Sequence, residues 1–251
     1  VLLMVFPLFY TAPSVLLEPE QPTAIIPFPE SLTSDREGYL LVILDGVGED
    51  IMYDDELMPE LVSRMKNSAV LPVTTGPLTL SATCVREMMT GVPNAPIDGL
   101  KNFNMGHPGG ADPWLLAAGD ERYSVGMVGS YVMGNMYGDK DGVEFVDTFK
   151  GHADYYEGDI ETGDVLETWL NTGKHDVIAA HFSGPDKVGH KWGILSEEYE
   201  DKMKDIDQQV GRLLGLVPSN WTVIVTADHG MTPSGSHGSA EADTRNVLAV
   251  I

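Results

Sequence analysis

The chain has 251 residues, enough for one large domain with its own hydrophobic core. Its 38 acidic residues outnumber the 15 basic ones and give a formal net charge of −23, which argues against nucleic-acid binding through a basic groove. A salty habitat and simple solubility are both compatible with this charge. A single cysteine, Cys84, excludes an intrachain disulfide and therefore a disulfide-stapled scaffold.

The N-terminal segment 1–17 is apolar and has no charged side chain. A full membrane span needs about 20 apolar residues, so we interpret this segment as the end of a membrane anchor or a signal remnant whose upstream part is missing. The alternative is a buried strand or helix of the domain. Residues 18–38 contain Pro19, Pro22, Pro27 and Pro29 among polar residues and are predicted to be a linker.

Strand and helix patterns alternate from residue 39 onward. Residues 39–44 form a continuous apolar run, as expected of a strand covered on both faces. The predicted strands are 39–44, 69–73, 123–128, 176–182, 221–226 and 246–251, the last one cut off by the chain end. This alternation predicts an α/β fold with a mostly parallel sheet and helices on both faces.

The most regular helix pattern spans 197–216, where apolar side chains recur every three or four residues. A second helix is predicted over 55–67, and a helix face at Val85, Met88 and Met89 after a Ser/Thr-rich turn. The segment 91–164 is rich in Gly and Asn and is predicted to hold mainly loops on the substrate side.

Acidic and histidine side chains cluster directly after three of the predicted strands. Chemistry in such sheets collects at the carboxyl ends of the strands, so we expect these side chains to meet at one edge. They are Asp45 after the first strand, Asp186 and His190 after 176–182, and Asp228, His229 and His237 after 221–226. Carboxylates and imidazoles together suit zinc and its first-row neighbours, and six ligands fit two adjacent metals better than one.

Each residue has an ordinary explanation when taken alone. An Asp after a strand often caps a helix, and Asp228-His229 in a loop is typical of a turn with a surface histidine. Asp186 and His190 are four residues apart and could form an ion pair on a helix, although we expect Asp186 and His237 in loops. The placement of all six at strand ends favours the metal interpretation.

These motifs resemble the alkaline-phosphatase superfamily. The resemblance rests on Asp45, Asp186-x-x-x-His190, Asp228-His229-Gly230 and Gly235-x-His237-Gly238. Within the superfamily the chain looks most like the type I phosphodiesterase/nucleotide pyrophosphatase branch, and there like the ethanolamine phosphate transferases of glycosylphosphatidylinositol anchor synthesis. The similar stretches are 180–193, 203–207, 227–232 and 89–93 through Asn102-Phe103, within a match from residue 39 to 239.

The resemblance implies that 39–251 is a C-terminally truncated, alkaline-phosphatase-like catalytic domain. It implies two divalent metal ions, with zinc expected. One site would be formed by Asp186, His190 and His237, and the other by Asp45, Asp228 and His229 together with the nucleophile.

The resemblance also implies a nucleophile at Ser81. The family places a Thr or Ser about ten residues before a Thr-Gly pair, where a helix begins, and counting back from Gly91 gives this serine. The relatives usually have Thr here, so Ser81 is a departure. Thr79 and Thr83 are the alternatives for a shifted alignment, and Ser81 as a mere helix cap is another. Cys84 is not followed by the Pro-x-Arg motif of sulfatases, which argues against a formylglycine sulfatase.

The implied activity is transfer of a phosphoethanolamine-type group to a glycolipid through a covalent phospho-enzyme. The alternative is a phosphodiesterase or nucleotide pyrophosphatase that uses water; a phosphosugar mutase and a binding protein without turnover are further readings. The partners would be a phosphodiester or phospholipid donor and a hydroxyl acceptor. The protein would be membrane-attached with its catalytic domain on the non-cytoplasmic side, and its oligomeric state is not indicated.

Several other residues have two interpretations. His181 would support a metal ligand or be an ordinary core histidine, and Asn102 would lie near the substrate or in a turn. Trp192 and Tyr131 would line the pocket or simply pack. Three histidines in predicted loops are expected at the surface: His107, His152 and His175.

Overall fold

The computed structural model describes residues 37–101, 104–107 and 112–251. In this part of the chain a seven-stranded sheet has the order β2-β7-β6-β1-β5-β3-β4. The strands are β1 (Gly38–Leu44), β2 (Val70–Thr74), β3 (Val125–Gly129), β4 (Val143–Asp147), β5 (Val177–Phe182), β6 (Trp221–Ala227) and β7 (Asn246–Val250). The predicted anchor segment 1–17 and nearly all of the predicted linker 18–38 lie outside the described residues.

The centre of the sheet is parallel and its β2 edge is antiparallel. β1 pairs in parallel with β5 and β6, while β7 runs antiparallel to β6 and to β2. In this register Leu44 lies opposite both Phe182 and Ala227, so three neighbouring strands end at the same level. The segments that follow these strands therefore start side by side at one edge.

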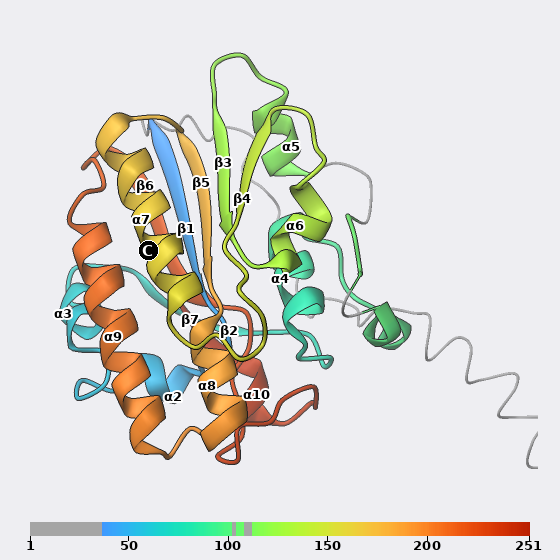
Figure 1. The fold of residues 1–251 in the computed structure, drawn as a ribbon, viewed down its shortest axis with the longest axis vertical. Helices are drawn as coiled ribbons and strands as arrows, with labels where there is room; N and C mark the ends of the chain where they lie inside the picture. The colour runs from blue at the N-terminus through green and yellow to red at the C-terminus, as the bar shows by residue number, and fades with distance from the viewer. Residues whose placement is uncertain (1–36, 102–103, 108–111) are drawn as a thin grey trace, which may run out of the picture.

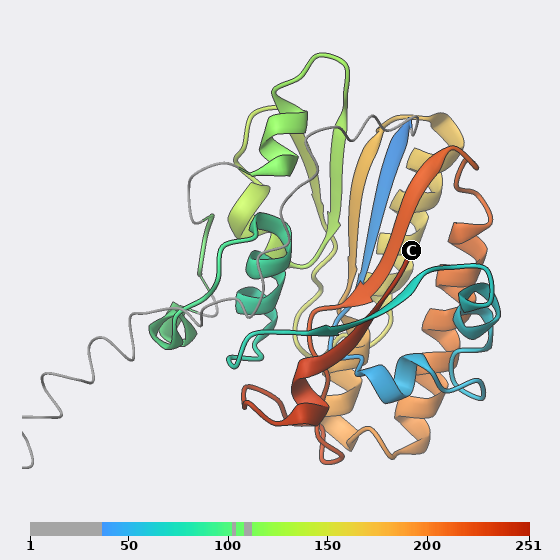
Figure 2. The same ribbon diagram turned by 180° about the vertical axis from the view of Figure 1, so that it is seen from behind.

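Helices cover both faces of this sheet (Figures 1 and 2). The helices are α2 (Glu49–Met52), α3 (Pro59–Met65), α4 (Ser81–Thr90), the 3₁₀ helix η1 (Pro96–Lys101), α5 (Pro113–Ala118), α6 (Tyr131–Tyr137), α7 (Glu157–Thr172), α8 (Gly184–Trp192), α9 (Glu197–Leu214) and α10 (Ala242–Arg245). α7, α9 and α3 lie on one face, α4, α5 and α6 on the other, and α8 and α10 gather below the carboxyl ends of β5 and β6. Within the described ranges, no helix is both long and apolar enough to cross a bilayer.

The alternation of side chains along the strands produces two hydrophobic cores. Leu40 and Val42 of β1 pack into the core under α7 and α9, whereas Leu41 and Ile43 point into the core under α4 and α6. All four side chains are buried. A continuous apolar run is thus the pattern that a strand covered on both faces requires, and the predicted fold class is confirmed.

The predicted strands are all present, with bounds shifted by at most two residues. The prediction of mainly loops over 91–164 is wrong, because this segment contains β3, β4, α5, α6 and the start of α7. Several of its glycines serve close packing instead of turns. A Cβ at Gly126 would collide with the His175 ring, and one at Gly134 would lie 2.7 Å from the Phe145 ring.

The helix predicted over 55–67 is shorter in the structure. α3 begins at Pro59, where proline is favoured because its fixed φ suits the first turn of a helix. Before it, Asp54 accepts hydrogen bonds from the backbone N–H groups of Glu56 and Leu57, which forms a turn. α2, directly after the first strand end, was not predicted.

Candidate metal centre

The structure brings all six predicted ligands to the carboxyl edge of the sheet, in two groups. Asp186, His190 and His237 form one group and Asp45, Asp228 and His229 the other, and within each group the ligand atoms lie within 4.8 Å of one another. We call them the outer and the inner group, because the inner one is fully buried and the outer one is partly exposed.

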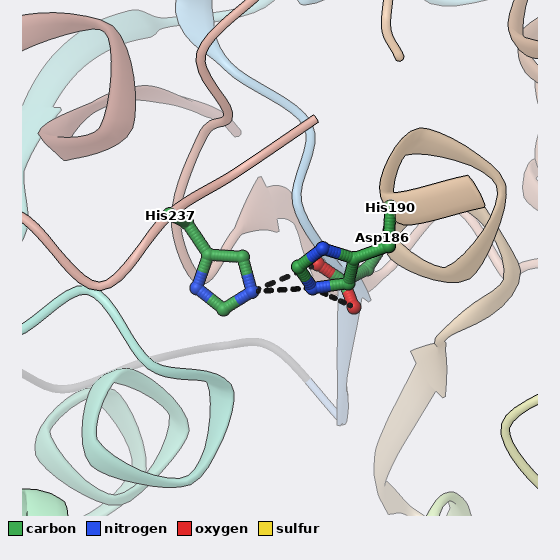
Figure 3. A group of neighbouring side chains, drawn as sticks. All are labelled: Asp186, His190 and His237. Atoms are coloured by element: carbon green, nitrogen blue, oxygen red, sulfur yellow. Dashed lines mark hydrogen bonds and ion pairs between the residues drawn. The ribbon is translucent and has the colours of Figure 1, made fainter. Parts of the chain in front are cut away.

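Asp186 was expected in a loop, but it lies in the first turn of α8. His190 follows one turn later on the same helix, and its Nε2 lies 3.5 Å from the Asp186 carboxylate. The pair therefore has the helical i, i+4 geometry that was the alternative interpretation, and His237 approaches the pair from the loop before α10 (Figure 3). The third residue turns a local ion pair into a three-ligand cluster.

The imidazole rings of the outer group face each other through their Nε2 atoms, 2.9 Å apart. His190 Nδ1 lies 2.8 Å from the carbonyl oxygen of Gly235, and His237 Nδ1 lies 2.6 Å from that of Thr79. A carbonyl only accepts hydrogen bonds, so each Nδ1 has the hydrogen and each neutral ring presents a lone pair at Nε2. Two lone pairs at this distance repel each other unless a proton or a cation lies beside them.

In the absence of a metal, the pKa values of the outer group favour a bound proton. Burial would lower the pKa of His237, but the hydrogen bond and charge of Asp186 outweigh it and raise the pKa to about 9. Burial would raise the pKa of Asp186, but His237, His229 and His190 keep it below its usual value. A divalent cation would replace this proton between the same atoms.

The inner group is also pre-oriented. His229 Nδ1 lies 3.1 Å from the Gly230 carbonyl oxygen, so its Nε2 presents a lone pair, 3.6 Å from Asp45 Oδ1 and 3.6 Å from Asp228 Oδ2. Asp228 Oδ1 accepts hydrogen bonds from the N–H groups of Gly46 and His229. Its buried Oδ2 has no hydrogen-bond partner among the described residues.

Neighbouring His181 offsets the negative charge of the inner carboxylates only in part. Burial, and then the negative charges of Asp228 and Asp186, raise the pKa of Asp45 to about 6. Burial likewise raises the pKa of Asp228 to about 6. Burial, and then the charge of His237, lower the pKa of His229 to about 4, which keeps this ring neutral and able to bind a metal. Three carboxylates and three oriented imidazoles fit two ions of the zinc type.

Ser81 lies at the inner group as the first residue of α4. The helix cap is Leu80, so Ser81 is not itself the cap. Its Oγ lies 3.2 Å from Asp45 Oδ1, to which it donates a hydrogen bond, and 3.3 Å from His229 Nε2. The free N–H groups at the start of a helix favour negatively charged oxygens, so a phosphate is favoured at this position.

The hydroxyls of the two alternative nucleophiles point elsewhere. Thr79 Oγ1 donates to the backbone oxygen of Ser239, and Thr83 Oγ1 donates to that of Leu78. Both threonines are fully buried. Of the three hydroxyls, that of Ser81 faces the inner group.

A cavity of about 370 Å³ opens onto both groups. Its lining includes Ser81, Asp186 and His190, together with the aromatic residues Tyr131, Phe149 and His152. The Tyr131 and Phe149 rings meet edge to face with centroids 5.0 Å apart. Phe149 was not foreseen, because it follows β4, a strand that the sequence pattern did not reveal.

Lys187 also lines this cavity, with its ammonium 4.9 Å from the centre of the Phe149 ring. Its position between Asp186 and His190 on α8 was the signal that could have identified it. Trp192 is not part of the lining; its ring packs against Tyr155, with centroids 4.8 Å apart.

His181 lies next to the inner group. Its Nε2 is 3.2 Å from Asp45 Oδ2, and its Nδ1 is 3.0 Å from Ser130 Oγ. Burial would lower its pKa, but Asp45 raises the pKa above the usual value. The ring therefore contacts a candidate ligand directly, as an orienting residue would.

The remaining histidines differ in exposure. The prediction of a surface position is wrong for His175, which is buried because its ring packs against Trp169 of α7 and Gly126 of β3. His107 is also mostly buried, with its Nε2 2.8 Å from Asp112. His152 is exposed, as predicted. Asn102 lies outside the described residues.

The chain is similar to several known proteins. The profile of the family described as type I phosphodiesterase / nucleotide pyrophosphatase matches residues 39–244. Among curated proteins, GPI ethanolamine phosphate transferase 2 of Yarrowia lipolytica is 25% identical over 225 residues, which is 84% of this chain but 26% of that protein. The catalytic subunit of human GPI ethanolamine phosphate transferase 3 is 38% identical over 69 residues, 28% of this chain and 6% of that protein.

The fold has solved counterparts. Murine ectonucleotide pyrophosphatase / phosphodiesterase 5 superposes with a TM-score of 0.57 and 17% identity, over 78% of this chain and 57% of that one. Compared with the Yarrowia relative, the chain spans only about a quarter of that protein's length. The family match over residues 39–244 includes both groups of candidate ligands.

Proposed function

This chain belongs to the type I phosphodiesterase / nucleotide pyrophosphatase family of the alkaline-phosphatase superfamily, and from that premise we propose that it is a two-metal phosphotransferase acting on phosphodiesters. Its reaction is the transfer of a phosphoethanolamine-type group to a glycolipid hydroxyl, through a covalent intermediate on Ser81. Residues 39–251 are the catalytic domain for this reaction.

The position of Ser81 Oγ supports the proposal most directly. The hydroxyl lies at the start of α4 and within 3.3 Å of both Asp45 Oδ1 and His229 Nε2. It also lines the cavity that reaches the outer group. A nucleophile beside one group of ligands, with a second group lining the same cavity, suits two-metal, in-line transfer of a phosphoryl group.

Asp186, His190 and His237 would hold one divalent ion, and Asp45, Asp228 and His229 the other, with zinc favoured by the mixed oxygen and nitrogen ligands. Bound there, the ions would lower the pKa of the serine hydroxyl and stabilise charge on the attacking and leaving oxygens.

The residues of the chain then account for the steps. Asp45 Oδ1 accepts the hydrogen bond of the Ser81 hydroxyl and is positioned to take its proton. The serine oxygen forms a bond to phosphorus, and the bond to the leaving alcohol breaks, with a proton passing to that alcohol. In the second half, the acceptor hydroxyl attacks phosphorus, loses its proton, and the serine oxygen leaves and is reprotonated.

The relatives' names support phosphoethanolamine transfer over hydrolysis, because the match over most of this chain is to a GPI ethanolamine phosphate transferase. The donor would then be a phospholipid with an ethanolamine headgroup and the acceptor a hydroxyl of a GPI-type glycolipid. The proposal includes membrane attachment with the catalytic domain on the non-cytoplasmic side, because both the proposed donor and the proposed acceptor are lipids.

Hydrolysis is the second candidate, favoured by the description of the family itself. The chemistry on Ser81 is the same, and water replaces the sugar hydroxyl. The two candidates therefore differ in the acceptor and share the covalent intermediate.

One experiment separates them. The zinc-loaded protein is incubated with phosphatidylethanolamine labelled in its headgroup and a mannose-containing GPI glycolipid. Labelled glycolipid supports the transferase, and labelled phosphoethanolamine released into water supports the hydrolase. If the donor stays intact and no label attaches to Ser81 after a rapid quench, the proposed function is wrong.

A further inference from the structure

A fully buried lysine lies behind the metal-side helix α8. Lys202 of α9 places its Nζ 2.8 Å from Asp159 Oδ2 of α7 and 3.2 Å from Asp205 Oδ2. The same ammonium lies 4.3 Å from the centre of the Tyr156 ring. Desolvation makes a buried ion pair a poor source of stability, and well-packed apolar side chains often serve as well. The presence of the pair here therefore calls for a specific role.

That role is indicated by a second contact of Asp159. Its carboxylate oxygens lie 3.2 and 3.1 Å from the backbone nitrogen of Gly184, the first residue of α8. The first N–H groups of a helix have no partner within the helix and are normally satisfied by a cap. Within the described chain, the side chain of the local cap residue, Ser183, makes no capping hydrogen bond. Asp159 supplies this acceptor from another helix.

The backbone at Gly184 packs directly against the ion pair. A Cβ at this position would lie 2.6 Å from Lys202 Cε and 2.7 Å from the Tyr155 carbonyl oxygen, and it would collide with the Asp159 carboxylate. Only a glycine fits, and the start of α8 is held against α7 and α9. Two residues further along the helix is Asp186.

A neighbouring contact connects the same two helices. Asp154 accepts hydrogen bonds from the N–H groups of Tyr156 and Gly158 at the start of α7. Its carboxylate also lies 3.9 Å from the ammonium of Lys187 on α8. The starts of α7 and α8 are thus fixed to each other at the edge where the outer group forms.

We propose that Asp159 and Lys202 form a positioning pair that fixes the first turn of α8 so that Asp186 and His190 present their ligand atoms to the outer metal. This inference rests on the proposed two-metal function. The ion pair with Lys202 holds the Asp159 carboxylate in place, and the carboxylate accepts the hydrogen bond of the Gly184 N–H. Neither residue touches the cavity, so the pair acts through α8.

A merely structural role makes a different prediction from a positioning role. Loss of a structural pair lowers Tm and leaves the affinity of both metal groups unchanged in the folded protein. Loss of a positioning pair weakens the outer group, which depends on α8, and spares the inner group, whose residues follow β1 and β6. The selectivity between the two groups is therefore the deciding measurement.

The test compares Asp159→Asn with a matched control on α9. Asn keeps the size of the side chain but removes the charge that pairs with Lys202. Lys204→Met is the control, because Lys204 makes an exposed i, i+4 pair with Glu200 at 3.6 Å on the same helix. If the single variant fails to fold, the double variant Asp159→Asn/Lys202→Met leaves no unpaired buried charge.

Zinc titrations of the metal-free proteins against a chromophoric chelator give the two binding constants, assigned to the groups with Asp186→Ala and Asp228→Ala. We expect Asp159→Asn to weaken the outer constant by about ten- to a hundredfold, as replacement of a residue that orients a ligand does, and to leave the inner one unchanged. Lys204→Met should change neither constant. Unchanged constants with a lower Tm, or an equal fall of both, would overturn the proposal.

Hydrogen exchange of the metal-free protein provides a readout independent of zinc. Asp159→Asn should accelerate exchange of the amides at the start of α8 and not those of β5. Exchange at α8 equal to that of the wild type would overturn the positioning role. A wild-type chain that binds no zinc would overturn the proposed metal sites instead, and acceleration confined to α8 would still support the positioning of this helix.

Discussion

His190 and His237 face each other through Nε2 atoms 2.9 Å apart, while each Nδ1 is held at a backbone carbonyl oxygen. The two rings come from α8 and from the loop before α10, so their meeting depends on the tertiary fold. Their tautomers are fixed by the backbone, and the reactive nitrogens are left pointing at one point. An isolated pair of surface histidines would have no reason to adopt this geometry.

The first prediction is that the folded chain binds two divalent ions, with zinc preferred. Elemental analysis after mild dialysis should give two ions per chain, because each group presents three oriented ligands. Removal of the ions by a chelator should lower Tm, since a ligand at a hundred times its Kd stabilises the folded state by about 2.7 kcal/mol. Less than one tightly held ion in a folded, active sample would contradict the prediction.

The second prediction concerns pH. In the metal-free protein the pKa of His237 is raised to about 9, so at pH 7 this ring holds a proton that zinc must displace. Binding should therefore release a proton, and affinity should rise with pH until the ring is neutral, above about pH 9. Calorimetry in buffers of different ionisation enthalpy measures the proton directly. A binding enthalpy independent of the buffer would argue against His237 as a ligand.

The third prediction is that Asp186→Ala and His237→Ala abolish turnover in a folded protein. Asp186 lies in the first turn of α8 and His237 in a loop, and neither belongs to the two hydrophobic cores. We expect the circular dichroism spectrum to persist and metal content to fall to that of the inner group. Lys191→Ala, an exposed position on α8, is the control and should retain activity. Near wild-type turnover of either ligand variant at saturating zinc would refute the site.

The edge of the sheet was predictable from the sequence, because apolar runs mark the strands and their carboxyl ends must lie together. Asp45 directly follows such a run, and Asp228 directly follows Ala227, the last residue of β6. The helical placement of Asp186 was only the alternative to a loop, although Pro185 favours the first turn of a helix. The cap for that helix comes from Asp159 on α7, and no local pattern reveals a partner so distant in the chain.

Burial of histidines was not predictable in the same way. His175 and His181 lie at opposite ends of the segment around β5, and both are buried. One packs against Trp169 and the other contacts Asp45. His181 lies at the site because it is near the carboxyl end of β5, which adjoins the carboxyl end of β1. His175 precedes β5 and therefore lies at the opposite edge of the sheet.

The last prediction concerns the nucleophile. Ser81→Ala should retain both metals but form no phospho-enzyme, because it removes the attacking oxygen and leaves the six carboxylate and imidazole ligands in place. Turnover should fall by orders of magnitude, on the order of what loss of a nucleophile costs in other enzymes. The helix should persist, since the capping residue is Leu80 and not Ser81.

Ser81→Thr is the matched variant and should retain activity. Its hydroxyl can occupy the same position between Asp45 Oδ1 and His229 Nε2, while the added methyl group limits χ1 and should lower the rate moderately. Rapid quenching with a labelled phosphodiester, followed by peptide mapping, identifies the modified residue. Label on Thr79 or Thr83 would move the nucleophile to a hydroxyl that now donates to the backbone. An active enzyme with no covalent label at any time would favour direct attack by water, because a double displacement on serine must pass through the phosphorylated residue.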